Sequence, residues 1–117
     1  MSKIDIIEII AKALESISSR GITVVQGWYD ENINDTHITF CELSDRSNNI
    51  SDDEEEDIAH TIQVDIWSKK DDWKLKKEVR KLMLNNDFGY VDGQDFLETD
   101  TKIYHKALRF SYLEEVD

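Results

Sequence analysis

The sequence IQVDIW, residues Ile62 to Trp67, decides the fold because its apolar and polar residues alternate. A basic segment follows from Lys69 to Leu84, in which apolar residues recur three and four positions apart. A second alternating run, Lys102 to Leu113, completes the block. An apolar period of two is typical of a strand and a period of 3.6 of a helix, so the block predicts strand, helix, strand.

Upstream of this block, the sequence predicts an amphipathic helix from Lys3 to Ser19. Ser2 and Asp5 mark its start, and Gly21 tolerates the left-handed backbone that ends a helix. The stripe expected to face the core consists of Ile7, Ile10, Leu14 and Ile17.

Three strands are expected next. The first two, Ile22 to Gln26 and His37 to Leu43, would be joined by a loop from Asp30 to Thr36 that is rich in Asp and Asn. The third, Ile58 to Trp67, would turn one face to the core and leave the other wet or in contact with a partner. The core face would carry Ile58, His60, Ile62, Val64 and Ile66, and the other face Thr61, Gln63, Asp65 and Trp67.

The second helix is expected to start near Ser68 and to end around Asn85-Asn86 and Gly89. Asp92-Gly93 predicts a two-residue turn between short flanks. The apolar stripe of this helix consists of Leu75, Val79, Leu82 and Met83. The last strand would carry Tyr104, Leu108, Phe110 and Tyr112 on one face. Its other face would carry His105, Ala107, Arg109 and Ser111.

Together these elements predict one α+β domain over residues 1–117, with two helices packed on one face of a mostly antiparallel sheet of about four strands. The single cysteine, Cys41, excludes an internal disulfide and lies in an apolar run, which indicates a buried, unreactive thiol. No apolar stretch approaches the roughly 18 residues that a membrane span needs, so we expect a soluble intracellular protein.

Charge is segregated along the chain. The net charge of -12 argues against general affinity for nucleic acid. Asp52 to Asp57 is an unbroken acidic run inside a polar stretch, Asp45 to Asp57, that is expected to be a mobile loop. Half of all basic residues lie in one segment: Lys69, Lys70, Lys74, Lys76, Lys77, Arg80 and Lys81. Such segregation suits a molecule whose faces meet complementary neighbours.

The polar stretch also fits the frame of a calcium loop, through Asp45, Ser47, Asn49, Ser51, Asp53 and Glu56. Ile50 stands where that loop needs glycine, however, and the flanking segments predict strands. A solvated acidic loop is the better interpretation.

The three histidines, His37, His60 and His105, lie on three different predicted strands. Zinc binding would require the fold to bring them together, and nothing in their spacing demands it. His105 could form an acid–base pair with Asp100 or Asp65, but no activated Ser or Cys accompanies them. We therefore expect no catalytic residue, no metal and no cofactor.

Protein contact is the remaining interpretation. The basic helix, with Trp73 among its lysines, could bind unpaired bases, but Asp71, Asp72 and Glu78 reduce its net charge to +4. A solvated face or a docking face for an acidic neighbour is favoured. A large ring on a wet face, such as Trp67 or Trp28-Tyr29, often marks a protein contact unless the fold covers it. The predicted interface residues are Trp67, Lys69, Lys70, Trp73, Lys77, Arg80, Asp53, Glu54, Glu55 and Glu56.

The order of elements resembles a group of small virion proteins of long-tailed bacteriophages or prophages, the tail-completion or head–tail joining proteins, related in fold to tail terminators. The resemblance rests on Ile62 to Lys69, on Asp87 to Tyr90 and on Asp100 to Phe110. Many members carry a proline ahead of the second strand, where this chain has Asp35-Thr36-His37.

The resemblance implies a structural, non-enzymatic part of the virion neck that is present in the host cytoplasm before assembly. Its members form six-fold rings that stop tube growth and mate with the head connector, while DNA passes through the lumen. It implies a second copy, the tail-tube protein and the connector as partners, a subunit that can be monomeric when free, and no membrane. The leading alternative is an acidic inhibitor that mimics DNA, and a third is a small hydrolase or metal protein using the histidines.

Overall fold

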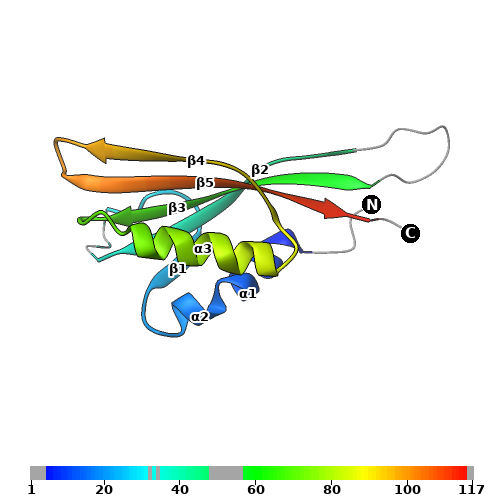
Figure 1. Ribbon diagram of the computed structural model, residues 1–117, viewed down its shortest axis with the longest axis horizontal. Coiled ribbons are helices and arrows are strands. Elements are labelled where there is room, and N and C mark those ends of the chain that lie inside the picture. The colour runs from blue at the N-terminus through cyan, green and yellow to red at the C-terminus, as the bar shows by residue number, and fades with distance from the viewer. Residues whose placement is uncertain (1–4, 32, 34, 48–56, 116–117) are drawn as a thin grey trace.

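The computed structural model describes residues 5–31, 33, 35–47 and 57–115, and Figure 1 shows the arrangement of its helices and strands. The fold is mixed, as predicted, but the described residues form three helices and five strands where two and about four were expected. In chain order these are α1 (Ile6–Ala13), α2 (Glu15–Ser18), β1 (Thr23–Gln26), β2 (His37–Ser47), β3 (Ile58–Ser68), α3 (Trp73–Asn85), β4 (Gly89–Glu98) and β5 (Ile103–Glu114).

The five strands form one sheet in the order β1-β2-β3-β5-β4. β1 is parallel to β2, and all the other neighbours are antiparallel. β3 is the central strand, where Val64 lies between Phe40 of β2 and Leu108 of β5. These three apolar side chains share one face, so the alternation in the sequence correctly predicted which residues turn to the core.

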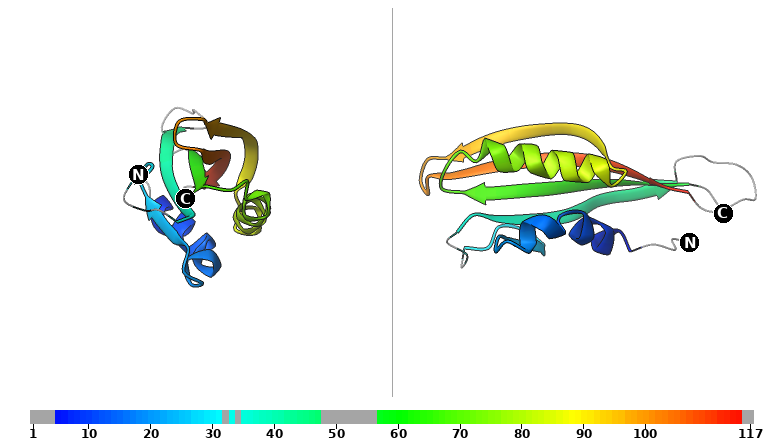
Figure 2. Two further views of the ribbon diagram at one scale, coloured as in Figure 1. Left: turned by 90° about the vertical axis from the view of Figure 1, so that its left-hand side faces the viewer. Right: turned by 60° about the horizontal axis from the view of Figure 1, so that its bottom comes forward.

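All three helices lie on that face of the sheet, as the two views in Figure 2 show. Asp5 caps α1, because its carboxylate accepts hydrogen bonds from the backbone N–H groups of Ile7 and Glu8 at 3.0 and 3.3 Å. The single predicted first helix is interrupted at Leu14, although Ser18 N still donates to Leu14 O at 3.2 Å. Ser2 lies outside the described residues.

The core forms between these helices and the sheet. Its fully buried side chains include Ile10, Leu14 and Ile17 from the first two helices, Val79 and Met83 from α3, and Ile62, Val64, Leu108 and Phe110 from the sheet. Burial of each large apolar side chain stabilises the fold by roughly 1.5–3 kcal/mol. The core therefore holds all three helices against one face of the sheet.

α3 begins later than predicted. Its N-cap is Asp72, whose side chain accepts from Leu75 N at 3.1 Å, whereas Ser68 is the last residue of β3. Across the helical layer, both guanidinium nitrogens of Arg20 donate to the carboxylate of Glu78, at 2.6 and 2.5 Å. This ion pair joins the end of α2 to α3.

Two strands are longer than the sequence predicted. β2 continues past an irregularity between Glu42 and Ser44, so Asp45 to Ser47 pair with β3 and are not part of a loop. The strand geometry of Asp45 and Ser47 argues against the calcium frame, whose other four positions lie outside the described residues.

β4 is likewise continuous. The predicted turn at Asp92-Gly93 is wrong, because these two residues pair with Arg109 and Leu108 of β5. Turn geometry instead occupies residues 99–102 between β4 and β5. Within the described part of the chain, no helix is long and apolar enough to cross a membrane.

Candidate functional site

The connection between β1 and β2 covers one end of the sheet face that lacks helices. Because the two strands are parallel, the chain must cross the sheet between them. Gly27 follows β1 with a φ of +134°, a conformation that favours glycine. The rings of Trp28 and Tyr29 then lie 5.5 and 4.9 Å from the ring of Trp67.

On this face, Trp67 was predicted to mark a protein contact unless the fold covers its ring, and the fold does cover it. Its side chain is covered by the two rings of the crossing loop, which leaves the residue 3% exposed, and its Nε1 donates to Thr39 Oγ1 at 2.9 Å. Trp28 is the outer ring of the cluster and remains 57% exposed. The aromatic surface anticipated here is therefore provided by Trp28.

A chain of polar side chains runs beside the aromatic cluster. Asp65, which is fully buried, accepts hydrogen bonds from His105 Nε2 at 2.6 Å and from Gln63 Nε2 at 2.8 Å. Gln63 Oε1 in turn accepts from Nε of Arg109 at 3.3 Å. The network connects a buried carboxylate on β3 to an exposed guanidinium on β5.

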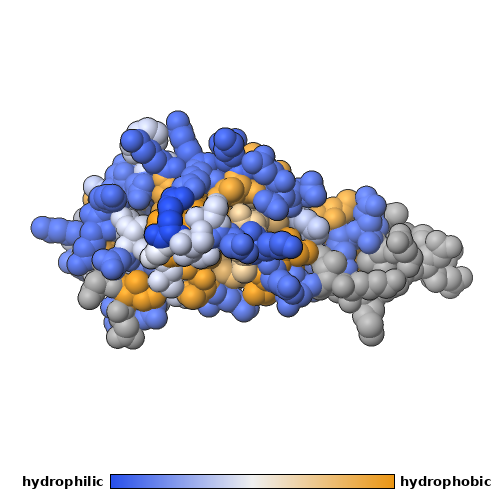
Figure 3. Space-filling model, turned by 90° about the horizontal axis from the view of Figure 1, so that it is seen from below, coloured by the Kyte–Doolittle hydropathy of each residue, from blue (hydrophilic) through white to orange (hydrophobic). Residues whose placement is uncertain are grey.

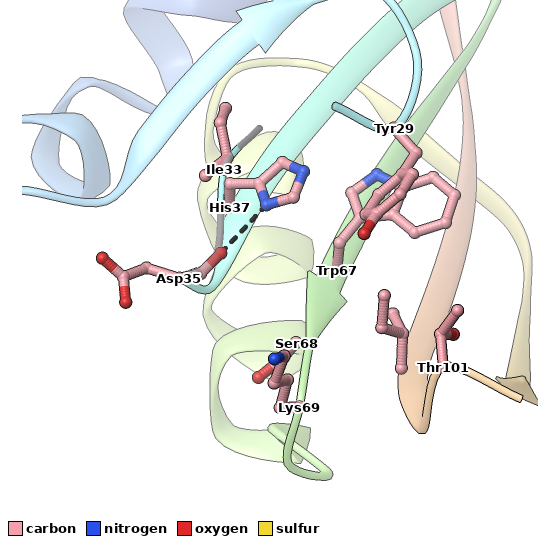
Figure 4. Close-up of a pocket in the computed structure, with 9 residues that line it drawn as sticks. Tyr29, Ile33, Asp35, His37, Trp67, Ser68, Lys69 and Thr101 are labelled. Carbon is pink, nitrogen blue, oxygen red and sulfur yellow. Dashed lines mark hydrogen bonds between the residues drawn. The ribbon is translucent and has the colours of Figure 1, made fainter. Parts of the chain in front are cut away.

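Two pockets open beside this cluster. The smaller, of about 170 Å³, lies next to Tyr29, His37 and Trp67 (Figure 4). His37 Nδ1 donates to the carbonyl oxygen of Asp35 at 3.0 Å, as the dashed line in Figure 4 marks. The larger pocket, of about 470 Å³, is lined by Trp28, Gln63, Asp92, Gln94, Phe96, Leu97, Glu98, His105, Ala107 and Arg109.

Of the two partners considered for His105, the structure pairs it with Asp65, but it does not assemble an acid–base catalyst around that contact within the described residues. Among the described residues, no serine or threonine hydroxyl and no cysteine thiol hydrogen-bonds to His105. Cys41 is half-buried rather than fully buried, and burial, followed by the nearby charge of Asp65, raises the pKa of its thiol. Both effects disfavour the reactive thiolate.

The three histidines do not share a site. His37 and His105 lie on the helix-free face, whereas His60 pairs with Tyr112 on the opposite face. No group of three ligating side chains suited to a metal occurs in the part of the chain that the structure describes.

His60 instead forms a polar bridge across three strands. Its Nδ1 contacts the carboxylate of Glu42 on β2, and its Nε2 lies 3.0 Å from Glu114 Oε1 on β5. Burial opposes the charged imidazolium, but the hydrogen bonds and charges of the two carboxylates outweigh it and raise the pKa of His60. The bridge ties β2, β3 and β5 together beyond the apolar core.

A second ionic cluster joins the sheet to the segment before α3. The buried ammonium of Lys106 lies 2.5 Å from Asp71 Oδ1 and 3.3 Å from Asp95 Oδ2, and Lys76 binds the other oxygen of Asp95 at 2.8 Å. Burial again opposes the charge, yet the hydrogen bonds to the two carboxylates raise the pKa of Lys106. The hydrogen bond from Lys76 is the main cause that lowers the pKa of Asp95.

The outer surface of α3 is basic and partly aromatic. Trp73, 52% exposed, has the ammonium groups of Lys74 and Lys77 at 5.6 and 5.1 Å from its ring, and Arg80 lies 4.2 Å from the ring of Tyr90. Figure 3 shows the side of the molecule that carries the helices, where hydrophobic patches lie between hydrophilic side chains.

The predicted interface residues are thus separated. Lys69, Lys70, Trp73, Lys77 and Arg80 are exposed in and just before α3, whereas Asp53, Glu54, Glu55 and Glu56 lie outside the described residues. The sequence did not single out Phe96, which packs on His105 at 5.4 Å between ring centroids. That contact depends on the register of β4 with β5, for which no local sequence signal exists.

Comparison with known proteins shows a likeness in fold but none in sequence family. No family model matches the sequence, and no curated protein matches it. In fold, the chain is similar to a chain of a solved structure described as the virion of a native gene transfer agent particle, with a TM-score of 0.63 and 10% sequence identity. The likeness covers 92% of each chain, so it extends over most of the fold.

Proposed function

We propose that this chain is a structural subunit of a phage-like virion, located at the neck, where a ring of copies completes the tail and joins it to the head connector. The observation that carries the proposal is the likeness in fold to a chain of a gene transfer agent virion over 92% of both chains. The resemblance of Ile62 to Lys69 and of Asp100 to Phe110 to tail-completion proteins supports a position at the neck.

The surface of the described residues suits such a role. It presents the exposed ring of Trp73 and exposed basic side chains on α3. A closed ring requires two different patches that fit each other, which a subunit with separate basic and acidic regions provides. In this proposal Lys69, Lys70, Trp73, Lys77 and Arg80 contact neighbouring subunits, and the acidic run Asp53 to Glu56 faces a neighbour or repels DNA in the lumen.

The proposed position at the neck implies which partners the subunit would bind. The subunit would be released in the host cytoplasm, monomeric or as a preformed ring, and would then bind the end of the tail tube and the head connector. DNA would pass through the ring without sequence recognition, in keeping with the net charge of -12.

Electron microscopy of the purified chain mixed with tail tubes tests the proposal. The tubes would be assembled from the tail-tube protein of the same phage or prophage. We expect a cap at one end of each tube and tubes that stop growing once capped. Uncapped tubes of unrestricted length, with the chain left as a free monomer, would refute a role in tail completion.

The alternative of a DNA mimic is less well supported. Mimicry requires carboxylates spread along one face, whereas α3 exposes Lys74, Lys77, Arg80 and Lys81. The one acid between them, Glu78, is paired with Arg20. Salt-sensitive binding to a DNA-binding protein, in the absence of any binding to tail tubes, would favour the mimic.

A further inference from the structure

Two surfaces of the chain carry opposite charge and exposed apolar side chains. The first, here called the basic stripe, is the outer surface of α3 and consists of Trp73, Lys74, Lys77, Arg80, Lys81 and Leu84. None of its four bases forms an ion pair with a described residue, since Lys76 and Arg20 hold the ion pairs of this region. At its two ends, Trp73 and Leu84 are 52% and 43% exposed.

The second surface, here called the acidic pocket, is the cavity of about 470 Å³ on the helix-free face. Trp28, Phe96 and Leu97 line it with apolar side chains that are 57%, 46% and 51% exposed. Its acids, Asp92 and Glu98, have no ion-pair partner within the described ranges, and its lining contains one arginine, Arg109, besides His105, which is hydrogen-bonded to Asp65. The strand β4 and the turn after it contain four acids and one base, Lys102, so the surroundings of the pocket are also acidic.

We infer that the basic stripe of one copy docks into the acidic pocket of the next, with the Trp73 ring entering between Trp28 and Phe96. The inference rests on the proposed function and deepens it, because it names the two patches that meet in the ring. The pocket is of the size that accepts a large side chain, and exposed tryptophans are frequent anchors of interfaces.

Charge favours a contact between the basic stripe and the acidic pocket over a contact between two copies of the same patch. Two stripes facing each other would bring eight bases together, and two pockets would bring their acids together, so a symmetric dimer through either patch is opposed. The stripe lies on the helix side of the sheet and the pocket on the other, so each copy can hold one neighbour on either side. This is the heterologous arrangement from which closed rings are built.

Charge reversal in two matched variants tests the contact. One variant reverses the stripe (Lys77→Glu/Arg80→Glu), and the other reverses the pocket (Asp92→Lys/Glu98→Lys). Each variant alone should associate about tenfold more weakly or worse in sedimentation equilibrium, because like charges then face each other. An equimolar mixture should recover association, because reversed stripes meet reversed pockets and the native patches still match.

The control for the charge of the stripe variant is Lys12→Glu combined with Arg46→Glu, which changes the net charge by the same amount at exposed positions outside both patches. It should associate as the native chain does. All three variants are checked for native circular dichroism, since every substituted side chain is exposed. Failure of the mixture to recover, with folded single variants, would overturn the inference.

Cross-linking provides a second measurement that does not depend on charge. In a Cys41→Ser background, Trp73→Cys and Gln94→Cys chains are mixed and oxidised, and a disulfide-linked dimer of one chain of each kind is expected. Lys12→Cys with Gln94→Cys serves as the control pair and should not link.

The outcomes separate this inference from the proposed function. Capped tail tubes with no stripe-to-pocket disulfide would leave the neck role standing and overturn the docking arrangement. Uncapped tubes with the specific disulfide would support the docking and refute tail completion. A native chain that stays monomeric at its solubility limit, with no specific disulfide even on tubes, would overturn the docking.

Discussion

The imidazole of His105 lies flat on the indole of Trp67, with ring centroids 3.7 Å apart and ring planes inclined by 10°. The same imidazole donates from Nε2 to the buried carboxylate of Asp65. One side chain of β5 therefore supports both the aromatic cluster and the polar network of β3.

Replacing His105 with phenylalanine should keep the stacking and remove the donor. Asp65 would then retain only the hydrogen bond from Gln63, and an undercompensated buried carboxylate destabilises a fold by about 3–5 kcal/mol. We expect the free energy of unfolding, measured by urea titration, to fall by that amount. His105→Phe combined with Asp65→Asn should recover part of it, and equal stability of His105→Phe and the native chain would contradict the network.

His60 should make stability depend on pH. Its folded pKa is raised above the unfolded value, so its contribution is fully present below the unfolded pKa of about 6.5 and is lost as the pH rises through the folded pKa. His60→Gln should therefore lower the free energy of unfolding by about 1.5–3 kcal/mol near pH 6 and by less near pH 9. Urea unfolding of both proteins across this range measures the difference. A gap that widens with rising pH would contradict the bridge.

The buried face of α3 should dominate its contribution to stability. Met83 is fully buried, so Met83→Ala should lower the free energy of unfolding by about 2–5 kcal/mol, through lost burial and the cavity left behind. Leu84, its neighbour, is 43% exposed, and Leu84→Ala should change stability by no more than about 0.5 kcal/mol. Equal losses in chemical denaturation would show that α3 packs in a different rotation.

The ion pair between Arg20 and Glu78 offers a test of the contact between α2 and α3. It is partly exposed, with side-chain exposures of 48% and 33%, so a double-mutant cycle to alanine should give a coupling energy of only about 0.2–1 kcal/mol. The coupling should shrink in high salt because solvent-exposed charges are screened. A coupling unchanged by salt would indicate a contact more buried than the structure shows.

The sequence predicted those parts of the fold in which local pattern and tertiary packing agree. The alternation in β3 and β5 correctly placed Val64 and Leu108 on one face, because strands in a half-covered sheet must alternate. Asp65 was one of the two partners that the sequence offered for His105. The pairing of Asp65 with Ala107 on the adjacent strand brings the side chains of Asp65 and His105 together.

The failures arise where pairing between strands overrides local preference. Asp92-Gly93 has the composition of a turn, yet the register of β4 with β5 continues through it after an irregularity near Val91. Whether the fold covers Trp67 could not be predicted, because a local pattern cannot reveal that β1 and β2 are parallel. That pairing sends Trp28 and Tyr29 across the sheet and covers the ring.

The position of β5 between β3 and β4 has a consequence for synthesis of the chain. β4 leaves the ribosome before the strand that pairs with it, and β3 has one unpaired edge until the same strand appears. Translation through residue 114 is thus needed before the backbone groups on either side of β5 find partners. A nascent chain stalled before β5 would expose two unpaired strand edges at once, and such edges can pair with other chains and cause aggregation.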